Sequence, residues 1–420
     1  MRIPSGPLAY QSKHAADPLN EAEKAALAFA ASGITGPTLA DLAYGKDGGG
    51  NILAGRVGRT IASGDAIQSV ALVVTDDTGT WLVRRPHDME TGEIHDVLAL
   101  AEKGELEEIY RKTRVKVSEG RCAVPLTPIT NLPINRWALF APGSTYFLPI
   151  NDLTLLYING LLEIFNEYNG VFVMDERAGF RPAGVGRYAR SKGGHLEDDA
   201  SKLKVATIRQ VEVMVSEFAT IEQGMMLQNL ALMTEALALG GYPNFANHEF
   251  AWFQSLGFRM HTMDASRYLG TRWLERLGMK LLGKDFEVEF PLGLEANGKT
   301  LLKPYCPPYH ESMEDAVRAV AELKFGEKGA FRCNEKPSAW TDSRSVMNGI
   351  TEVSERAIET TIAYCNYVFE TYGRFPATKP PYTTVMGFQA CRLDTDFYEK
   401  FYKKEALGQN HWDRGNPGKD

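Results

Sequence analysis

The stretch "TIEQGMMLQNLALMTEALALGG", residues 220–241, decides how this chain folds. Residues 205–239 repeat apolar side chains at helical spacing, at Ile208, Val211, Val215, Phe218, Ile221 and Met225. This period predicts one long helix over 205–239, and the pair Gly240 and Gly241 is typical of a helix end. The second half of the helix is apolar nearly all round, which indicates that it is central or packs on a partner subunit.

Polar residues interrupt this apolar helix. Glu222, Gln228 and Asn229 lie inside the run, and Gly224 among them lowers helix propensity by about 1 kcal/mol relative to Ala. Buried polar groups need hydrogen-bond partners, and a glycine inside a helix indicates a close neighbour. Two interpretations stay open: a core helix with a polar notch, or a helix that contributes to a binding site.

A second informative stretch, "GRTIASGDAIQSVALVVTD", covers residues 58–76. Arg56 and Arg59 precede Ser63 and Gly64, and a strand rich in β-branched residues follows. Guanidinium groups beside small residues and free backbone N–H groups are suited to a phosphate. The alternative is an exposed basic turn before a strand, because clusters of Gly, Ser and Arg are common.

Other local patterns predict the remaining elements. An Asp-Asp-Thr-Gly turn between the strand near Val70 and the run ending at Val83 predicts a β-hairpin. Further elements are predicted as a helix over 18–32, a strand over 286–295 and helices over 312–326 and 351–372. Residues 175–204, dense in Gly, Arg and Lys without an apolar period, predict a long mobile loop.

Composition limits the classes of function. The 420 residues are 44% hydrophobic and 24% charged, with a formal net charge of −7, which describes a globular protein and disfavours a nucleic-acid surface. No stretch reaches the roughly 18 to 20 apolar residues of a membrane helix, so we expect no membrane partner. Five cysteines without a C-x-x-C pair indicate reduced thiols and a cytoplasmic location.

Motifs for metal or nucleophilic chemistry are weak. Cys306 and His310 flank two prolines in "CPPYH" without a second ligand pair, so we expect no metal site. "GVGRYA", residues 184–189, does not directly follow a strand, as a dinucleotide fingerprint must. No G-x-S-x-G motif is present.

Together, the loop and the helix resemble the nitroreductase-fold flavoproteins, particularly their azoline-oxidase branch. "RTIASGDAIQSVALVV" is similar to the flavin-contacting loop R-x-x-P-S-x-G-x-x-x-P and its strand. "EQGMMLQNLALMTEALALGG" is similar to the helix E-x-G-x-x-x-Q-N-x-x-L-x-A-x-x-L-G-L-G, and "AFAASGITG" to a segment upstream of the loop. The resemblance covers about residues 20–300, and the Q-N helix is its most specific part.

The resemblance implies an α+β nitroreductase-like fold with a central, mostly antiparallel sheet flanked by helices, in an intertwined homodimer. It also implies noncovalent FMN at the dimer interface. The implied cofactor-binding residues are Arg56, Arg59, Ser63, Gly64, Gln68, Glu222, Gly224, Gln228, Asn229 and Lys303. In this interpretation residues 1–57 form an N-terminal helix and Gly-rich loop, and 58–330 an FMN domain with inserted loops. Residues 331–420 form a C-terminal helix and an extension that wraps the partner subunit.

Three functions follow as hypotheses. The first is an FMN-dependent oxidoreductase that uses NAD(P)H to reduce an electrophilic small molecule. The second is a flavin oxidase or dehydrogenase of a peptide or small molecule. The third is a binding protein of this fold that has lost flavin, because Asp65 and Ala66 stand where the family often has flavin-contacting Gly or Asn. Tyr188 and His195 are candidate proton donors, with ordinary surface residues as the alternative.

Overall fold

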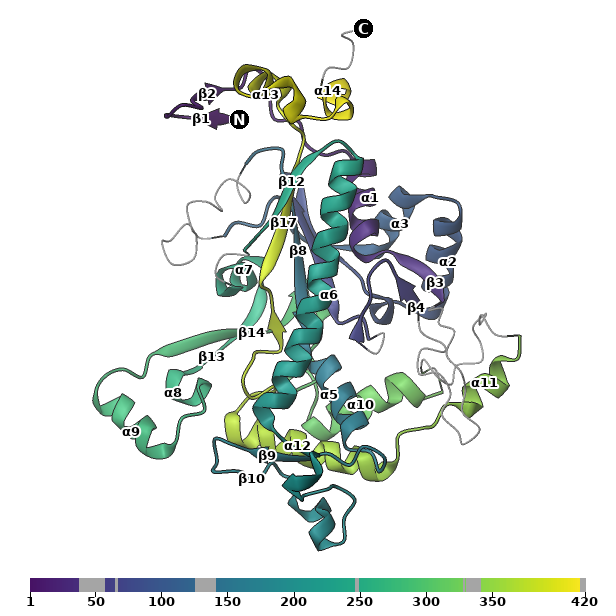
Figure 1. The fold of residues 1–420 in the computed structure, drawn as a ribbon, viewed down its shortest axis with the longest axis vertical. Helices are drawn as coiled ribbons and strands as arrows, with labels where there is room; N and C mark the ends of the chain where they lie inside the picture. The colour runs from purple at the N-terminus through teal and green to yellow at the C-terminus, as the bar shows by residue number, and fades with distance from the viewer. Residues whose placement is uncertain are drawn as a thin grey trace.

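The computed structural model describes residues 1–37, 57–64, 67–124, 141–245, 249–327, 329 and 341–415 (Figure 1). Arg56, the Asp65-Ala66 pair and Cys333 lie outside the described residues. The fold is mixed α+β with antiparallel sheets, which confirms the predicted fold class at this level.

The main sheet has seven strands, six of them in the order β12-β17-β8-β5-β6-β7, while β16 also pairs with β8. Every pairing in this sheet is antiparallel. The predicted hairpin is present, with Asp76 opposite Gly79, and the β-branched run of β5 is buried along its whole length. The strands are β5 (Val70–Asp76), β6 (Gly79–Val83), β7 (Arg114–Glu119), β8 (Thr145–Asp152), β12 (Gly240–Phe245), β16 (Tyr382–Thr383) and β17 (Met386–Cys391).

Helix α6 (Ile208–Ala236) runs across this sheet in front of β8 and β17 (Figure 1). Its N-terminus has a capping box, in which Thr207 accepts a hydrogen bond from the Gln210 N–H and the Gln210 side chain accepts one from the Thr207 N–H. Its buried side chains divide between two clusters: those of the second half pack with strands β5, β8 and β17 and with helix α1 (Glu21–Ser32), and those of the first half pack with α5 (Leu153–Ile164) and α12 (Glu355–Tyr372). The long helix was therefore predicted correctly.

The glycine pair after α6 has another role than the predicted helix stop. The helix ends at Ala236, and Gly240 and Gly241 open strand β12. A Cβ on Gly241 would lie 2.7 Å from the Gln389 carbonyl oxygen and 2.8 Å from the Phe388 ring. Glycine is needed here because β17 approaches closely.

A second layer of helices forms the largest buried cluster. It contains α5 (Leu153–Ile164), α10 (Met313–Phe325) and α12 (Glu355–Tyr372), and beside it lies a small sheet of β9 (Phe172–Asp175), β10 (Arg181–Pro182) and β11 (Val205–Thr207). Ser312 caps α10, because its hydroxyl oxygen accepts a hydrogen bond from the Asp315 N–H at 3.1 Å.

Residues 175–204 are not the long loop that their composition predicts. They contain β10 and short 3-10 helices, and backbone hydrogen bonds close them onto neighbouring segments. The Leu196 N–H donates to the Tyr188 carbonyl oxygen at 3.0 Å, and the Glu197 N–H donates to the Gly170 carbonyl oxygen at 2.8 Å. The sequence pattern missed this order because the bonds are between backbone groups, and the buried side chains, such as Val185 and Leu196, follow no regular period.

An arm projects away from the main sheet (Figure 1). Strands β13 (Phe258–Asp264) and β14 (Glu287–Ala296) form its antiparallel ribbon, with α8 (Ala265–Tyr268) and α9 (Trp273–Leu281) at its tip. Strand β15 (Lys299–Leu302) pairs with β14. No side chain of α9 is buried, and Trp273 is 71% exposed.

The first described strands and the last described helices lie together at the top of Figure 1. The N-terminal hairpin of β1 (Arg2–Ile3) and β2 (Tyr10–Gln11) lies beside α13 (Thr395–Phe401). The segment predicted to wrap a partner, 331–420, contributes α12 and β17 to the core of its own chain. The remaining elements are β3 (Ile34–Pro37), β4 (Val57–Arg59), α2 (Thr91–Glu102), α3 (Leu106–Thr113), α7 (Glu249–Leu256), α11 (Ser343–Gly349) and α14 (Gln409–Gly415).

Candidate functional site

The carboxylate of Glu222 on α6 is the centre of a buried polar cluster under the loop of residues 59–70. Its Oε2 accepts hydrogen bonds from the Ser63 hydroxyl at 2.7 Å and the Ser69 hydroxyl at 3.2 Å. Its Oε1 accepts one from the Val70 N–H at 3.1 Å. Glu222 is 1% exposed, so the polar residue that interrupts the apolar helix fixes the start of β5.

Arg59 supplies the positive charge beside this carboxylate. Its Nη1 lies 3.6 Å from Glu222 Oε1, and its Nε donates to the Ser32 carbonyl oxygen at 3.1 Å. Burial lowers the pKa of Arg59 to about 10, although Glu222 raises it in part, so the guanidinium stays protonated at neutral pH. Its side chain is 2% exposed, and Nη1 has no hydrogen-bond partner among the described residues.

Gln68 adopts an unusual backbone conformation in the same loop. Its φ is +58°, a region that costs free energy for residues other than glycine. Its N–H donates to the Ser63 hydroxyl at 2.7 Å, and its side-chain amide donates to the Val57 carbonyl oxygen. Gln68 and Ser63 therefore close the loop on itself above Glu222.

Asn229 links the helix to the beginning of the loop. Its side-chain amide donates to the carbonyl oxygens of Ala30 and Thr60, both at 3.0 Å. Gly224 and Gln228 lie on the exposed side of α6 instead. The structure thus brings Arg59, Ser63, Gln68, Glu222 and Asn229 together.

Gly64 lies at the surface of the loop, next to α6. A Cβ placed on it would meet the Phe218 side chain at 3.6 Å, an ordinary contact. Phe218 itself is 44% exposed. The loop and the exposed side of α6 therefore form one continuous surface at this point.

Arg85, which the sequence analysis missed, extends the charged cluster away from Glu222. Its Nη1 donates to the Ser69 carbonyl oxygen at 3.2 Å and to Asp152 at 3.0 Å, and its Nε donates to Asp88 at 2.9 Å. Burial raises the pKa of Asp152, with Arg85 opposing that rise. Burial also raises the pKa of Asp88, but Arg85 and His87 outweigh burial and lower it to about 2. The only sequence signal was the spacing of Arg85 and Asp88 in "RRPHD".

Lys303, the predicted late phosphate ligand, lies away from the loop, at a cavity of about 690 Å³. We call this the β15 cavity. It is bounded by the ends of β6 and β7, by β15 and by α10, and its polar lining includes Arg84, Arg85, Lys299, Lys303, Tyr305 and His310. Because Arg85 also contacts Ser69, one side chain connects this cavity to the loop.

The candidate proton donors lie in another part of the molecule, within residues 175–204. Tyr188 is 8% exposed and belongs to the cluster around α5 and α12. Its ring centroid is 6.0 Å from that of His195, whose Nε2 lies 2.8 Å from the Phe165 carbonyl oxygen. Tyr188 is therefore a core residue, and no described contact joins either side chain to the Glu222 cluster.

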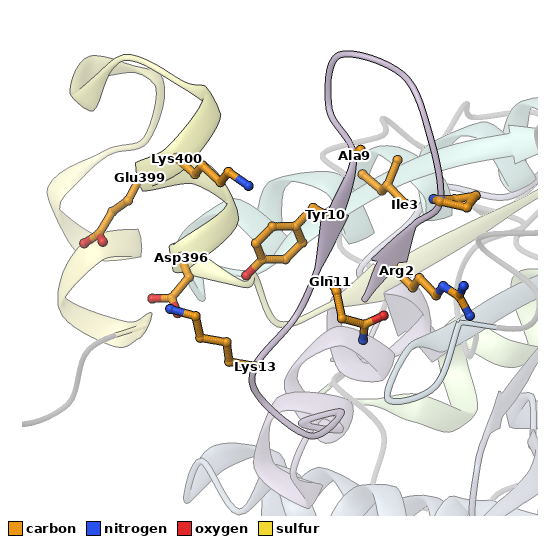
Figure 2. Close-up of a pocket in the computed structure, with 10 residues that line it drawn as sticks. Arg2, Ile3, Ala9, Tyr10, Gln11, Lys13, Asp396, Glu399 and Lys400 are labelled. Carbon is orange, nitrogen blue, oxygen red and sulfur yellow. The ribbon is translucent and has the colours of Figure 1, made fainter.

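A second, more open hollow lies between the N-terminal hairpin and α13, around Tyr10 (Figure 2). Its charged lining residues are Arg2, Lys13, Asp396, Glu399 and Lys400. Nearby, ligand atoms of His14, Asp394 and Asp396 lie within 4.8 Å of one another. The Tyr10 hydroxyl donates to Asp394 at 3.0 Å, and His14 Nε2 lies 3.1 Å from Asp396. These carboxylates connect the two ends of the chain.

Comparison with known proteins leaves the family open. No protein-family model matches the chain, and no curated protein matches it. In the part of the chain that the structure describes, no helix has both the length and the apolar character needed to cross a membrane.

Proposed function

We propose that this protein is an FMN-dependent oxidoreductase that transfers two electrons from NAD(P)H to an electrophilic small molecule. The observation that carries the proposal is the cluster of Arg59, Ser63, Gln68 and Glu222 beside Asn229. These residues were assigned to one site from the resemblance alone, and in the fold they contact one another or the same loop.

In this proposal the flavin binds on the surface that these residues leave exposed, at the loop and on α6. Ser63 and Glu222 are engaged with each other, so their role is to hold the loop. The loop surface at Gly64 and the exposed Gly224 and Gln228 would contact the flavin. The buried Arg59 Nη1, which has no hydrogen-bond acceptor among the described residues, would supply positive charge behind the loop.

In this proposal the cofactor and the protein contribute different parts of the reaction. FMN, when bound, supplies hydride transfer. Side chains of α6 bind the described backbone at Thr60 and Val70, and carbonyl oxygens of α1 accept from Arg59 and Thr60, so these parts of the loop are positioned before a ligand arrives. Preorganisation of this kind lowers the cost of binding.

The exposed side of α6 supports the homodimer that belongs to this proposal. Apolar residues separated alternately by four and three positions form one seam, with one polar member, at Met214, Phe218, Ile221, Met225, Gln228 and Leu232. A seam with this period packs against a second helix in a left-handed crossing, and one polar position fixes its register. In this proposal the second helix is α6 of another copy. The variant Ile221→Glu would then be monomeric by light scattering, whereas a dimer of unchanged mass would contradict the seam.

A second function has its own supporting observation. The Arg59 guanidinium is 2% exposed and lies beside a carboxylate, which limits its access to a phosphate. This favours a binding protein of the same fold that has lost flavin. A flavin oxidase or dehydrogenase would share the loop and the seam and differ in its electron acceptor.

The absorbance spectrum of the purified protein, followed by heat release of any chromophore, separates these functions. Released FMN supports the enzyme, and NAD(P)H oxidation with a quinone or nitro compound then separates a reductase from an oxidase. A colourless protein that excess FMN cannot reconstitute supports the binding protein.

The matched variants are Gly64→Leu and Gly92→Leu. Both glycines leave room for a side chain, with no contact closer than 3.6 Å for a Cβ at Gly64 and none within 4 Å at Gly92. Gly64→Leu should reduce flavin content at least tenfold because it covers the loop surface, while Gly92→Leu should retain it. Equal flavin content in both variants would remove the loop from the site.

A further inference from the structure

The β15 cavity carries an inference that does not depend on flavin. Its volume of about 690 Å³ is within the range of sites for small molecules. Three separate parts of the fold line it: the segment after β6, the strand β15 with the residues that follow, and helix α10. A ligand there would be held between the main sheet and the sheet of the arm.

Two lysines contribute positive charge without a counter-ion. Lys299 lies at the start of β15 and Lys303 directly after its end, and both line the cavity. Neither lysine forms an ion pair or donates a side-chain hydrogen bond to any residue that the structure describes. Both ammonium groups are therefore available to an anion.

Two further nitrogen atoms, His310 Nε2 and Arg84 Nε, are buried in the cavity wall without a partner among the described residues. His310 Nε2 is buried and has no hydrogen-bond partner among the described residues, while its ring stacks on Tyr305 at 5.3 Å. Arg84 Nε is buried and equally unpartnered, although both Nη atoms of Arg84 bind Glu93. Buried donors in native proteins nearly always have acceptors, so these two point to a missing acceptor.

The acidic residues of the lining do not cancel this charge. Asp88 is engaged by Arg85 through both carboxylate oxygens, and Asp152 engages Arg85 from the other side. Glu322 on α10 is the other carboxylate among the described lining residues. Two free lysines and one remaining carboxylate leave the cavity with a positive balance.

We propose that the β15 cavity binds an anionic small molecule through a phosphate or carboxylate group held by Lys299, Lys303 and His310. Lysine is a common phosphate ligand that acts as a point charge. Burial and Lys303 lower the pKa of His310, with Asp315 opposing, so near neutral pH the ring is uncharged and offers one N–H donor. The site is separate from the Arg59 loop, which Arg85 joins to it through the Ser69 carbonyl oxygen.

Isothermal titration of the full chain with inorganic pyrophosphate, and in parallel with citrate, tests this assignment. The variant Lys299→Ala/Lys303→Ala removes two exposed side chains and should leave the fold intact. Lys192→Ala/Lys202→Ala, two exposed lysines of the 175–204 segment, is the matched control. We expect one anion per chain, affinity at least tenfold weaker in the first variant, and no change in the control.

The two probes separate the sources of the anion. Tighter binding of pyrophosphate than citrate assigns a phosphate group, and the reverse assigns a carboxylate. His310→Ala should weaken the preferred probe, while His310→Gln, which keeps an N–H donor, should retain more of the affinity. The proposal is overturned if neither probe binds at millimolar concentration or if the double lysine variant binds as well as the control. It is also overturned if that variant loses bound flavin, because the anion would then be the phosphate of FMN itself.

Discussion

Replacing Glu222 by alanine should be among the most destabilising single substitutions in this protein. The change removes the acceptor of the Ser63 hydroxyl, the Ser69 hydroxyl and the Val70 N–H, and leaves the Arg59 charge without its carboxylate. Removal of one partner from a buried ion pair costs about 3 to 5 kcal/mol. We therefore expect Glu222→Ala to lower the free energy of unfolding by about 4 kcal/mol. Domains of this kind have about 5 to 15 kcal/mol in total.

Urea unfolding followed by circular dichroism, with every variant at one protein concentration, measures this effect. Glu217→Ala is the matched control, because Glu217 is exposed on the same helix, and its effect should be within about 0.5 kcal/mol. Glu222→Gln keeps the volume and one acceptor oxygen and should cost about 2 kcal/mol.

A double variant tests the physical reason. Arg59→Met with Glu222→Leu removes both charges and should be more stable than Glu222→Ala, because no uncompensated charge stays buried. The reasoning is refuted if Glu222→Ala lies within about 1 kcal/mol of the wild type, or if the double variant is no more stable than the single one.

Four further variants, at Asp88, Asn229, Gly241 and Gly160, give predictions that can be measured separately. The pKa of Asp88 is lowered from 3.8 to about 2. The ionised carboxylate should therefore stabilise the fold by about 2 kcal/mol above pH 4, and this stabilisation should be lost as the pH falls through 2. In acid unfolding, Asp88→Asn should not show this loss of stability between pH 4 and 2. Asn229→Ala removes two hydrogen bonds and should cost about 1 to 2 kcal/mol in urea unfolding, and wild-type stability would contradict its role as the link between loop and helix. Gly241→Ala should cost about 1 to 3 kcal/mol in thermal unfolding, because its Cβ would meet β17. On α5, a Cβ at Gly160 would meet no heavy atom within 4 Å outside its own helix backbone. Gly160→Ala should therefore raise the free energy of unfolding by up to about 1 kcal/mol.

Local sequence patterns predicted the helices and strands whose formation depends mainly on residues close together in the chain. The apolar period predicted α6, and the β-branched run with its turn predicted β5 and β6. The composition of residues 175–204 misled, because backbone hydrogen bonds and a few scattered buried side chains, such as Val185 and Leu196, order that segment without an apolar period. No local pattern marks β17 as a central strand: its partners in β8 and β12 are distant in the chain, and Gly240 and Gly241 suggested a helix end instead.

Some residues of the candidate site were likewise predicted from local sequence patterns, and others were not. Glu222 and Asn229 were visible as polar residues in an apolar helix, and Arg59 and Ser63 as part of a loop suited to a phosphate. Only the resemblance assigned the helix and the loop to one site. Arg85 and Asp152 were missed because they are 67 residues apart and meet only after β6 and β8 join the same sheet. The β15 cavity was equally hidden, because it needs β15 and α10 beside the end of β6.

The charged groups around Ser69 form one chain of contacts rather than separate pairs. Glu222 binds the Ser69 hydroxyl and Arg85 binds its carbonyl oxygen, so this one residue joins the carboxylate on α6 to the β15 cavity. Buried ion pairs often contribute little net stability compared with apolar side chains of the same volume. Their structural effect here is positional, because they fix the start of β5 from α6 on one side and from the end of β6 on the other. A ligand in the β15 cavity that draws on the charge of Arg85 would therefore act on the backbone of the loop that Glu222 holds, with Ser69 as the shared contact.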